Sequence, residues 1–186
     1  MARTPSVMTP LGKKAPGFTL FDTESGKDLS LETLKGSTAT VIMFICNHCP
    51  FVKHVNPQLV KLGNDYKNKG ISFIAISSND VAGYPEDGPE QMKLVASQLN
   101  YPFPYLYDAT QAVAKAYEAA CTPDFFIFDV DLLLVYRGQL DDSRPGNGQP
   151  VTGADIRRAL DHLTQGKSVP ADQKPSIGCN IKWRES

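Results

Sequence analysis

The chain has 186 residues, of which 41% are hydrophobic and 21% are charged, and its formal net charge is −1. These values are typical of a globular protein with a sizeable core, and they exclude an intrinsically disordered chain. They give no electrostatic basis for binding nucleic acid or an anionic membrane, because phosphate recognition needs a concentrated basic surface. We therefore expect the partners to be proteins or small molecules.

The N-terminal residues 1–16 are polar and contain proline, and they lack the apolar segment of a secretory signal. No apolar run approaches the length of a transmembrane helix. We therefore expect a cytoplasmic location. In a reducing cytoplasm a cysteine pair is more often catalytic or metal-binding than a structural disulfide.

The predicted elements begin with a small β-hairpin. Residues 18–22 alternate between apolar and polar, Ser25-Gly26 indicates a turn, and residues 29–31 follow as the second strand. Residues 39–45 form a continuous apolar run, which predicts a central strand covered on both faces. The next predicted helix contains Pro57, so we expect a kink or a break there.

Strands and helices then alternate toward the end of the chain. Strands are predicted at 71–76, 104–107, 125–128 and 132–136, and helices at 89–99, 112–119 and 155–163. This order predicts an α/β fold with a central, mostly parallel sheet, helices on both faces and an antiparallel edge pair. We expect one domain over residues 1–168, with an N-terminal arm at 1–14. The apolar content of residues 169–186 predicts an extended C-terminal tail packed on that domain.

The sequence Cys46-Asn47-His48-Cys49-Pro50 joins the predicted central strand to a helix. It delivers two thiols to a helix N-terminus, where unpaired backbone N–H groups and the helix dipole favour a thiolate over a thiol. A lowered thiol pKa makes a cysteine reactive. The pair therefore predicts redox chemistry, with half a zinc site or two buried cysteines as the plainer interpretations.

Further short motifs accompany this pair along nearly the whole chain. They are residues 15–20, 44–53, 78–80 with 84–87, 121–126, 136–138 with 141–147, and 175–179 with 182–183. Together they resemble the thioredoxin-like proteins of the alkyl hydroperoxide reductase/thiol-specific antioxidant superfamily, often called peroxiredoxin-like. The resemblance implies a thioredoxin-like fold with a central mixed sheet and a redox-active dithiol, without a bound cofactor or metal.

The resemblance also implies a role for the segment that begins at Cys121. In the thioredoxin-like fold the bond between Thr122 and Pro123 is cis and faces the cysteine pair. Backbone groups of Thr122 can then pair with an extended substrate, so Thr122 and Pro123 are predicted to bind substrate. Cys121 is brought near the pair, either as a third redox thiol or as a small apolar filler.

The sequence departs from true peroxiredoxins in two respects. Their motif is Pro-x-x-x-Thr-x-x-Cys, and neither Cys46 nor Cys49 as its last residue gives proline and threonine at the required positions. The arginine that activates peroxide is missing near Thr122, so Arg137 or Arg144 would have to supply it. We therefore expect another reaction than the usual peroxidase cycle.

The predicted function is that of a thiol–disulfide oxidoreductase with a protein or small-molecule disulfide as substrate and a second dithiol system as reductant. Cys46 is predicted to be the exposed attacking thiolate at the helix cap, and Cys49 the resolving thiol. His48 is expected to place a hydrogen-bond donor or partial positive charge beside the Cys46 sulfur. That would favour the thiolate and make the pair more oxidising than that of thioredoxin.

Two other functions compete with this prediction. The first is a thiol peroxidase with antioxidant activity, in which a thiolate becomes a sulfenic acid and a neighbouring cysteine resolves it. The second is a copper-binding chaperone that holds Cu(I) through thiolates. A zinc site would need Cys121 with Cys179 or His48 as further ligands. Cys179 is otherwise expected to be a packing residue, unless the tail caps the site and lets it resolve a disulfide.

Overall fold

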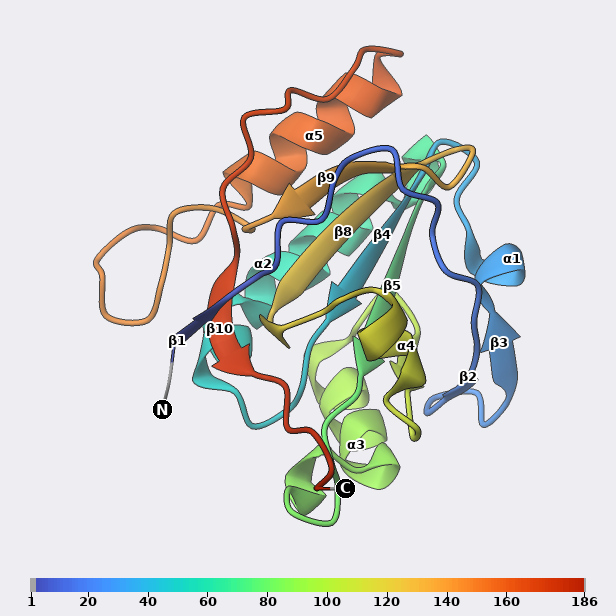
Figure 1. Ribbon diagram of the computed structural model, residues 1–186, viewed down its shortest axis with the longest axis vertical. Coiled ribbons are helices and arrows are strands. Elements are labelled where there is room, and N and C mark those ends of the chain that lie inside the picture. Colours follow the sequence, from blue (N-terminus) through green and yellow to red (C-terminus); the bar gives the residue numbers. More distant parts are fainter. Residues whose placement is uncertain (1–2, 186) are drawn as a thin grey trace.

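The structure is a computed structural model that describes residues 3–185, and a seven-stranded mixed sheet crosses it (Figure 1). The strands, in spatial order, are β3 (Asp28–Ser30), β2 (Thr19–Asp22), β6 (Tyr105–Tyr107), β5 (Ile71–Ser77), β4 (Ala39–Phe44), β8 (Asp124–Asp129) and β9 (Leu134–Gly138). Strands β4, β5 and β6 are parallel, whereas β2–β3 and β8–β9 are antiparallel pairs at the two edges. The predicted mixed sheet and N-terminal hairpin are thus confirmed.

Strand β4 lies at the centre of this sheet, and all six of its residues are buried. Five of them are apolar, and the hydroxyl of Thr40 accepts a hydrogen bond from the N–H of Gly36. Its neighbours are β5 on one side and β8 on the other. Val41 and Met43 belong to the apolar core on one face, whereas Ile42 and Phe44 belong to the core on the opposite face. This alternation follows from the two-residue repeat of a strand, and it lets β4 end inside the molecule.

Helices cover both faces of the sheet. The α-helices are α1 (Leu31–Leu34), α2 (Pro50–Tyr66), α3 (Pro89–Leu99), α4 (Ala112–Ala116) and α5 (Ala154–Thr164), and the 3₁₀ turns are η1 (Lys67–Lys69) and η2 (Pro85–Asp87). Helices α2, α3 and α5 contribute to one apolar core, whereas α1 and α4 contribute to the other. Across residues 3–185, no helix is long and apolar enough to cross a membrane.

A kink or a break was predicted at Pro57, and helix α2 continues through this residue without a break. Proline removes the hydrogen bond to the carbonyl four residues earlier, which here belongs to Lys53. Pro57 and Lys53 are both exposed, so water can satisfy that carbonyl. The buried residues Val55 and Leu59 pack against the core on the other side of the helix and hold it together.

A second, three-stranded antiparallel sheet was not predicted from the sequence. It joins β1 (Arg3–Pro5), β10 (Ile177–Asn180) and β7 (Cys121–Thr122) in that order. Figure 1 shows β10 in red beside β1 in dark blue, so a segment near the start of the chain pairs with one near its end. Strand β10 thereby brings the C-terminal tail against the segment that contains Thr122.

Candidate active site

The cysteine pair lies where the chain leaves β4 and enters α2. The N-cap residue of α2 is Cys49, and Pro50 follows at the first helical position, where its missing N–H needs no partner. The predicted cap residue was Cys46, so the structure moves this position by three residues. Cys46 is also buried, with 2% of its surface exposed, whereas Cys49 has 0% exposed. Neither thiol is the exposed group that the sequence predicted.

Thr122 contacts both sulfurs of the pair. Its bond to Pro123 is cis, as the resemblance implied. The Sγ atom of Cys46 lies 3.5 Å from Oγ1 of Thr122, and the Sγ atom of Cys49 lies 3.2 Å from the Thr122 carbonyl oxygen. The side chain and main chain of one residue therefore hold the two thiols in place.

Cys121 is next to Thr122 in the chain, but its sulfur does not join the pair. Neighbouring residues of a strand point to opposite sides, so Cys121 faces away when Thr122 faces the pair. The Cys121 Sγ lies 3.6 Å from the carbonyl oxygen of Pro123. Burial raises the pKa of this thiol well above its usual range, and the charge of Asp124 adds to the effect. These surroundings are those of a buried, protonated thiol.

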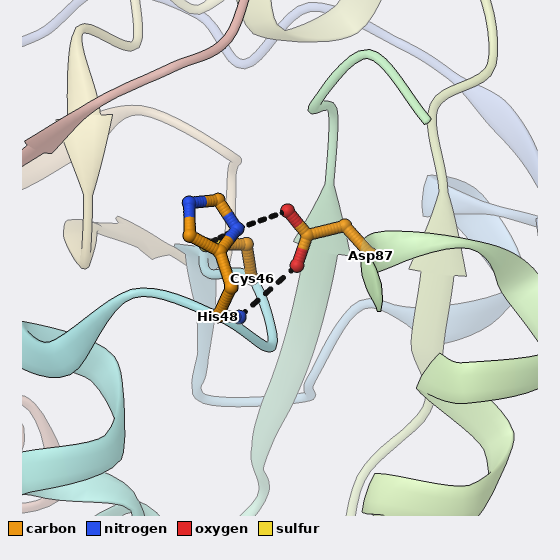
Figure 2. Close-up of side chains that lie close together, drawn as sticks. All are labelled: Cys46, His48 and Asp87. Atoms are coloured by element: carbon orange, nitrogen blue, oxygen red, sulfur yellow. Dashed lines mark hydrogen bonds and ion pairs between the residues drawn. The ribbon is translucent and has the colours of Figure 1, made fainter. Parts of the chain in front are cut away.

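His48 is oriented by Asp87, a residue for which the sequence predicted no role (Figure 2). The Nδ1 atom of His48 lies 2.5 Å from Oδ2 of Asp87 and 3.9 Å from the sulfur of Cys46. The other carboxylate oxygen of Asp87 accepts hydrogen bonds from the backbone N–H groups of Asn47 and His48, at 2.8 and 3.1 Å. Asp87 thus fixes both the turn between the cysteines and the ring of His48.

The Asp87 carboxylate is fully buried, with 0% of its residue surface exposed, and Asn79 donates a further hydrogen bond of 2.8 Å to it. Tyr84, from the same loop, stacks on the His48 ring with 5.0 Å between the centroids. Tyr84, Asp87 and Asn79 all lie in segments that carried the family resemblance. That membership was the available signal, but the sequence did not indicate that the acid would be buried beside the thiols.

The surroundings of the pair shift the pKa values of its two thiols in opposite directions. The pKa of Cys49 is lowered to about 5, first by its hydrogen bond with Cys46 and further by hydrogen bonds with Cys179, Thr122 and the N–H of Val52. The pKa of Cys46 is raised, first by its hydrogen bond with Cys49, then by burial and by the charge of Asp87. The sequence had predicted the charge on Cys46, with His48 as its stabiliser. In the structure the His48 ring is held by Asp87, and the charge of Asp87 opposes a thiolate on Cys46.

Cys179 is the fourth cysteine of the chain, and β10 carries it to the pair. Its sulfur lies 2.8 Å from the sulfur of Cys49, and only 1% of the residue is exposed. Cys179 pairs with Thr122 across the antiparallel strands β10 and β7. All four cysteines are in the reduced form. The backbone of Thr122, predicted to pair with a substrate, is therefore already paired with the chain's own tail.

The same surroundings bear on metal binding. Cys46, His48 and Asp87 offer one donor atom each, and these atoms lie within 4.8 Å of one another (Figure 2). Such a set of soft and hard donors could hold a transition metal, although the contact between Nδ1 of His48 and Oδ2 of Asp87 already uses two of the atoms. The zinc ligand set that included Cys121 does not fit, since the sulfur of Cys121 lies against Pro123.

Comparison with known proteins places this site in a family. Residues 11–137 match the model of the AhpC/TSA family. The chain belongs to this family. No curated protein matches its sequence.

Solved structures give the same result for the fold. An uncharacterized conserved protein from Geobacillus kaustophilus is 66% identical, with a TM-score of 0.98 over 100% of this chain and 98% of that one. A hypothetical protein from Sinorhizobium meliloti is 48% identical, with a TM-score of 0.96 over 98% and 100% of the two chains. The thioredoxin domain of a thiol-disulfide oxidoreductase from Bacteroides vulgatus is 21% identical, with a TM-score of 0.59 over 69% and 88%.

These similarities confirm the predicted thioredoxin-like fold and the predicted superfamily. Membership of the AhpC/TSA family, together with two thiols in hydrogen-bond contact at a helix N-terminus, supports a redox enzyme of the thioredoxin type. Of the predicted site residues in this family member, Cys46, Cys49, His48 and Thr122 come together, and Cys121 does not.

Proposed function

We propose that this protein is a thiol–disulfide oxidoreductase that uses Cys46 and Cys49 as its dithiol. The observation that carries the proposal is the contact of both sulfurs with Thr122, at 3.5 Å to its side chain and 3.2 Å to its main chain. Two thiols held against one polar residue at a helix N-terminus can close to a disulfide with little movement. A dithiol of this kind works in a reducing compartment such as the cytoplasm, where a second dithiol can reduce it again.

In the first step Cys46 attacks one sulfur of the substrate disulfide. Cys49 is covered by Cys179 and Thr122, so Cys46 is the thiol that a substrate meets first. Cys46 passes its proton to the Cys49 thiolate along the hydrogen bond between them and attacks as a thiolate. The substrate S–S bond breaks, one substrate sulfur leaves as a thiolate, and the other is joined to Cys46.

In the second step Cys49 resolves this mixed disulfide. Its proton, which its lowered pKa makes easier to remove, passes to the substrate thiolate that left in the first step, and Cys49 attacks the sulfur of Cys46. The bond between Cys46 and the substrate breaks, and the second substrate thiolate leaves. The substrate has gained two electrons, the protein holds a disulfide between Cys46 and Cys49, and an external dithiol restores the reduced pair.

The test is the reduction of insulin and of a small aromatic disulfide by the wild-type protein with a dithiol donor. We expect the activity to be lost in Cys46→Ser and in Cys49→Ser. Cys121→Ser is the matched control, because it removes a nearby buried thiol whose sulfur contacts Pro123 instead of the pair. Wild-type rates in both Cys46→Ser and Cys49→Ser would refute the proposal.

A peroxidase is the second candidate, and family membership is the observation that favours it. The two arginines that could activate a peroxide are engaged elsewhere. Arg137 is fully buried and bonded to Asp124 and to the Glu118 carbonyl, whereas Arg144 is bonded to Gln139 and to nearby main-chain oxygens. We therefore expect slow oxidation of the reduced protein by hydrogen peroxide in stopped-flow measurements. A fast reaction that disappears in Cys46→Ser would favour the peroxidase instead.

A copper-binding chaperone is the third candidate, favoured by the donor atoms of Cys46, His48 and Asp87. Metal analysis of protein purified under reducing conditions distinguishes it from an oxidoreductase. We expect far less than one metal ion per chain, because the carboxylate of Asp87 already holds His48. Stoichiometric copper or zinc, lost in His48→Ala, would overturn the oxidoreductase proposal.

A further inference from the structure

Strand β10 brings Cys179 to the cysteine pair across 130 positions of the chain. In the antiparallel register Cys179 is opposite Thr122, the residue that contacts both Cys46 and Cys49. A strand paired in this way occupies the place that an added substrate strand would take at a sheet edge. The tail therefore presents a thiol to the site in the manner of a bound peptide.

Gly178 explains how β10 can come so close. A Cβ atom at this position would lie 2.0 Å from the carbonyl oxygen of Thr122, which is far inside any allowed contact. Only glycine fits, and the strand therefore lies directly against Thr122. The neighbouring Cys179 is placed at the pair by this close approach.

Hydrogen bonds on both sides of Cys179 hold the tail in place. On one side the Ser176 hydroxyl donates to the carbonyl oxygen of Pro123 at 2.6 Å. On the other side the N–H of Lys182 donates to Oδ1 of Asn79 at 2.9 Å, and the Lys182 carbonyl accepts from the N–H of Asp80 at 2.8 Å. Because both flanks are fixed, the contact between Cys179 and Cys49 is a built feature of the fold.

The two sulfurs are in hydrogen-bond contact at 2.8 Å, with Cys49 as the donor to Cys179. The pKa of Cys179 is raised to about 12, first by burial and then by its hydrogen bond with Cys49. A disulfide bond length of about 2.05 Å requires only a small further approach.

We propose that Cys179 is a third redox thiol, which exchanges with the disulfide between Cys46 and Cys49. This inference rests on the proposed dithiol chemistry and extends it. The sulfur of Cys179 attacks Cys49, the bond between Cys46 and Cys49 breaks, and a bond between Cys49 and Cys179 forms. The proton of Cys179 passes to the departing Cys46 sulfur, so the site ends with one disulfide and one thiol, as it began, and no external oxidant is needed.

The exchange changes where the oxidised bond lies. All three thiols are buried, with 2% of Cys46, 0% of Cys49 and 1% of Cys179 exposed. The exchange moves the disulfide from the pair that attacks the substrate in the proposed cycle to the contact between Cys49 and the tail. Reduction through Cys46 proceeds when its thiol attacks Cys49 and restores the bond between Cys46 and Cys49. The tail thus acts as an internal acceptor of oxidising equivalents.

The experiment is disulfide mapping by mass spectrometry after one equivalent of diamide and acid-quenched alkylation. In Cys46→Ser we expect an intramolecular disulfide between Cys49 and Cys179 and the loss of two alkylatable thiols. The double variant Cys46→Ser/Cys121→Ser is the matched control and should form the same disulfide. The double variant Cys46→Ser/Cys179→Ser should not form this disulfide. The inference would be overturned if all three thiols of the Cys46→Ser protein still reacted with the alkylating agent, or if its disulfide involved Cys121.

The wild-type protein tests the exchange itself. After oxidation we expect two species, one with the bond between Cys46 and Cys49 and one with the bond between Cys49 and Cys179 and an alkylated Cys46. Detection of the first species alone would overturn the exchange. Disulfide mapping in the Cys46→Ser protein tests the third thiol without turnover of a substrate. Insulin reduction by the Cys179→Ser protein tests the dithiol activity without the third thiol. Failure of the inference and failure of the proposed function are therefore distinguishable.

Discussion

Asn79 connects the C-terminal tail to the carboxylate beside the active-site cysteines. Its Oδ1 accepts the N–H of Lys182 at 2.9 Å, while its Nδ2 donates to Oδ2 of Asp87 at 2.8 Å. Asn79 itself is buried, so both partners depend on it for a hydrogen bond that water cannot replace. The position of the tail and the orientation of His48 are therefore coupled through one side chain.

Asn79→Ala should loosen the tail. A buried polar group left without a hydrogen-bond partner lowers the free energy of unfolding by about 1–3 kcal/mol. This substitution removes the acceptor of the Lys182 N–H and one of the donors to Oδ2 of Asp87. We expect a lower free energy of unfolding and faster alkylation of Cys179, measured by mass spectrometry of the tail peptide. Asn64→Ala, at an exposed helical position, is the control. Equal alkylation rates in the wild type and Asn79→Ala would contradict the coupling.

Asp87→Asn should lower the pKa of the Cys46 thiol. That pKa is raised first by the hydrogen bond with Cys49, then by burial and by the negative charge of Asp87. The comparison is clearest in a Cys49→Ser background, where the pH dependence of Cys46 alkylation reports on one thiol. We expect the profile to move to lower pH. Glu86→Gln, an exposed acid next in sequence, should leave the profile unchanged.

Reduced protein should hold one thiolate at neutral pH. The absorbance of the thiolate at 240 nm should rise with a midpoint near pH 5, because the pKa of Cys49 is lowered to about 5. Cys46→Ala should raise this midpoint most and Cys179→Ala less, following the order of the two hydrogen bonds. Alanine is used because serine would keep a hydrogen-bond donor. An unchanged midpoint in Cys46→Ala would show that the hydrogen bond with Cys46 is not the cause.

The same thiolate sets a pH dependence of stability in the reduced protein. The folded pKa of Cys49 lies below the unfolded value of about 8.5, so the folded state gains stability as the thiolate forms. The free energy of unfolding should therefore increase between about pH 5 and about pH 8.5. Below about pH 5 the contribution of the Cys49 thiolate to this free energy should be absent. Denaturant unfolding of the wild type and Cys49→Ser measures this, and parallel curves for the two proteins would contradict it.

Gly178→Ala should displace β10 from β7. The added methyl group would overlap the carbonyl oxygen of Thr122, and overpacking of this kind costs about 1–3 kcal/mol or more. We expect faster proteolysis of the tail and a slower closure of the disulfide between Cys49 and Cys179. Gly17→Ala is the control, since that glycine has an ordinary backbone conformation and open space around it. Identical tail protection in Gly178→Ala and the wild type would show that the close approach is not needed.

Local sequence determined the elements of the sheet and the position of the dithiol. The continuous apolar run of β4 favours a buried strand, and Pro50 marks the start of α2 because proline suits the first turn of a helix. Both cysteines therefore come directly before that helix, although Cys49 and not Cys46 is its cap residue. These features depend on residues close together in the chain, so pattern and spacing were sufficient to predict them.

Tertiary structure alone decided how the thiols are paired and charged. Asp87 reaches His48 from 39 positions away, and Cys179 reaches Cys49 from 130 positions away. Strand β7 has only two residues, too few to show a repeat, so its partner β10 could not be found from periodicity. Part of the lowered pKa of Cys49 therefore comes from hydrogen bonds with Cys179 and Thr122, and contacts between such distant segments form only when the chain has folded.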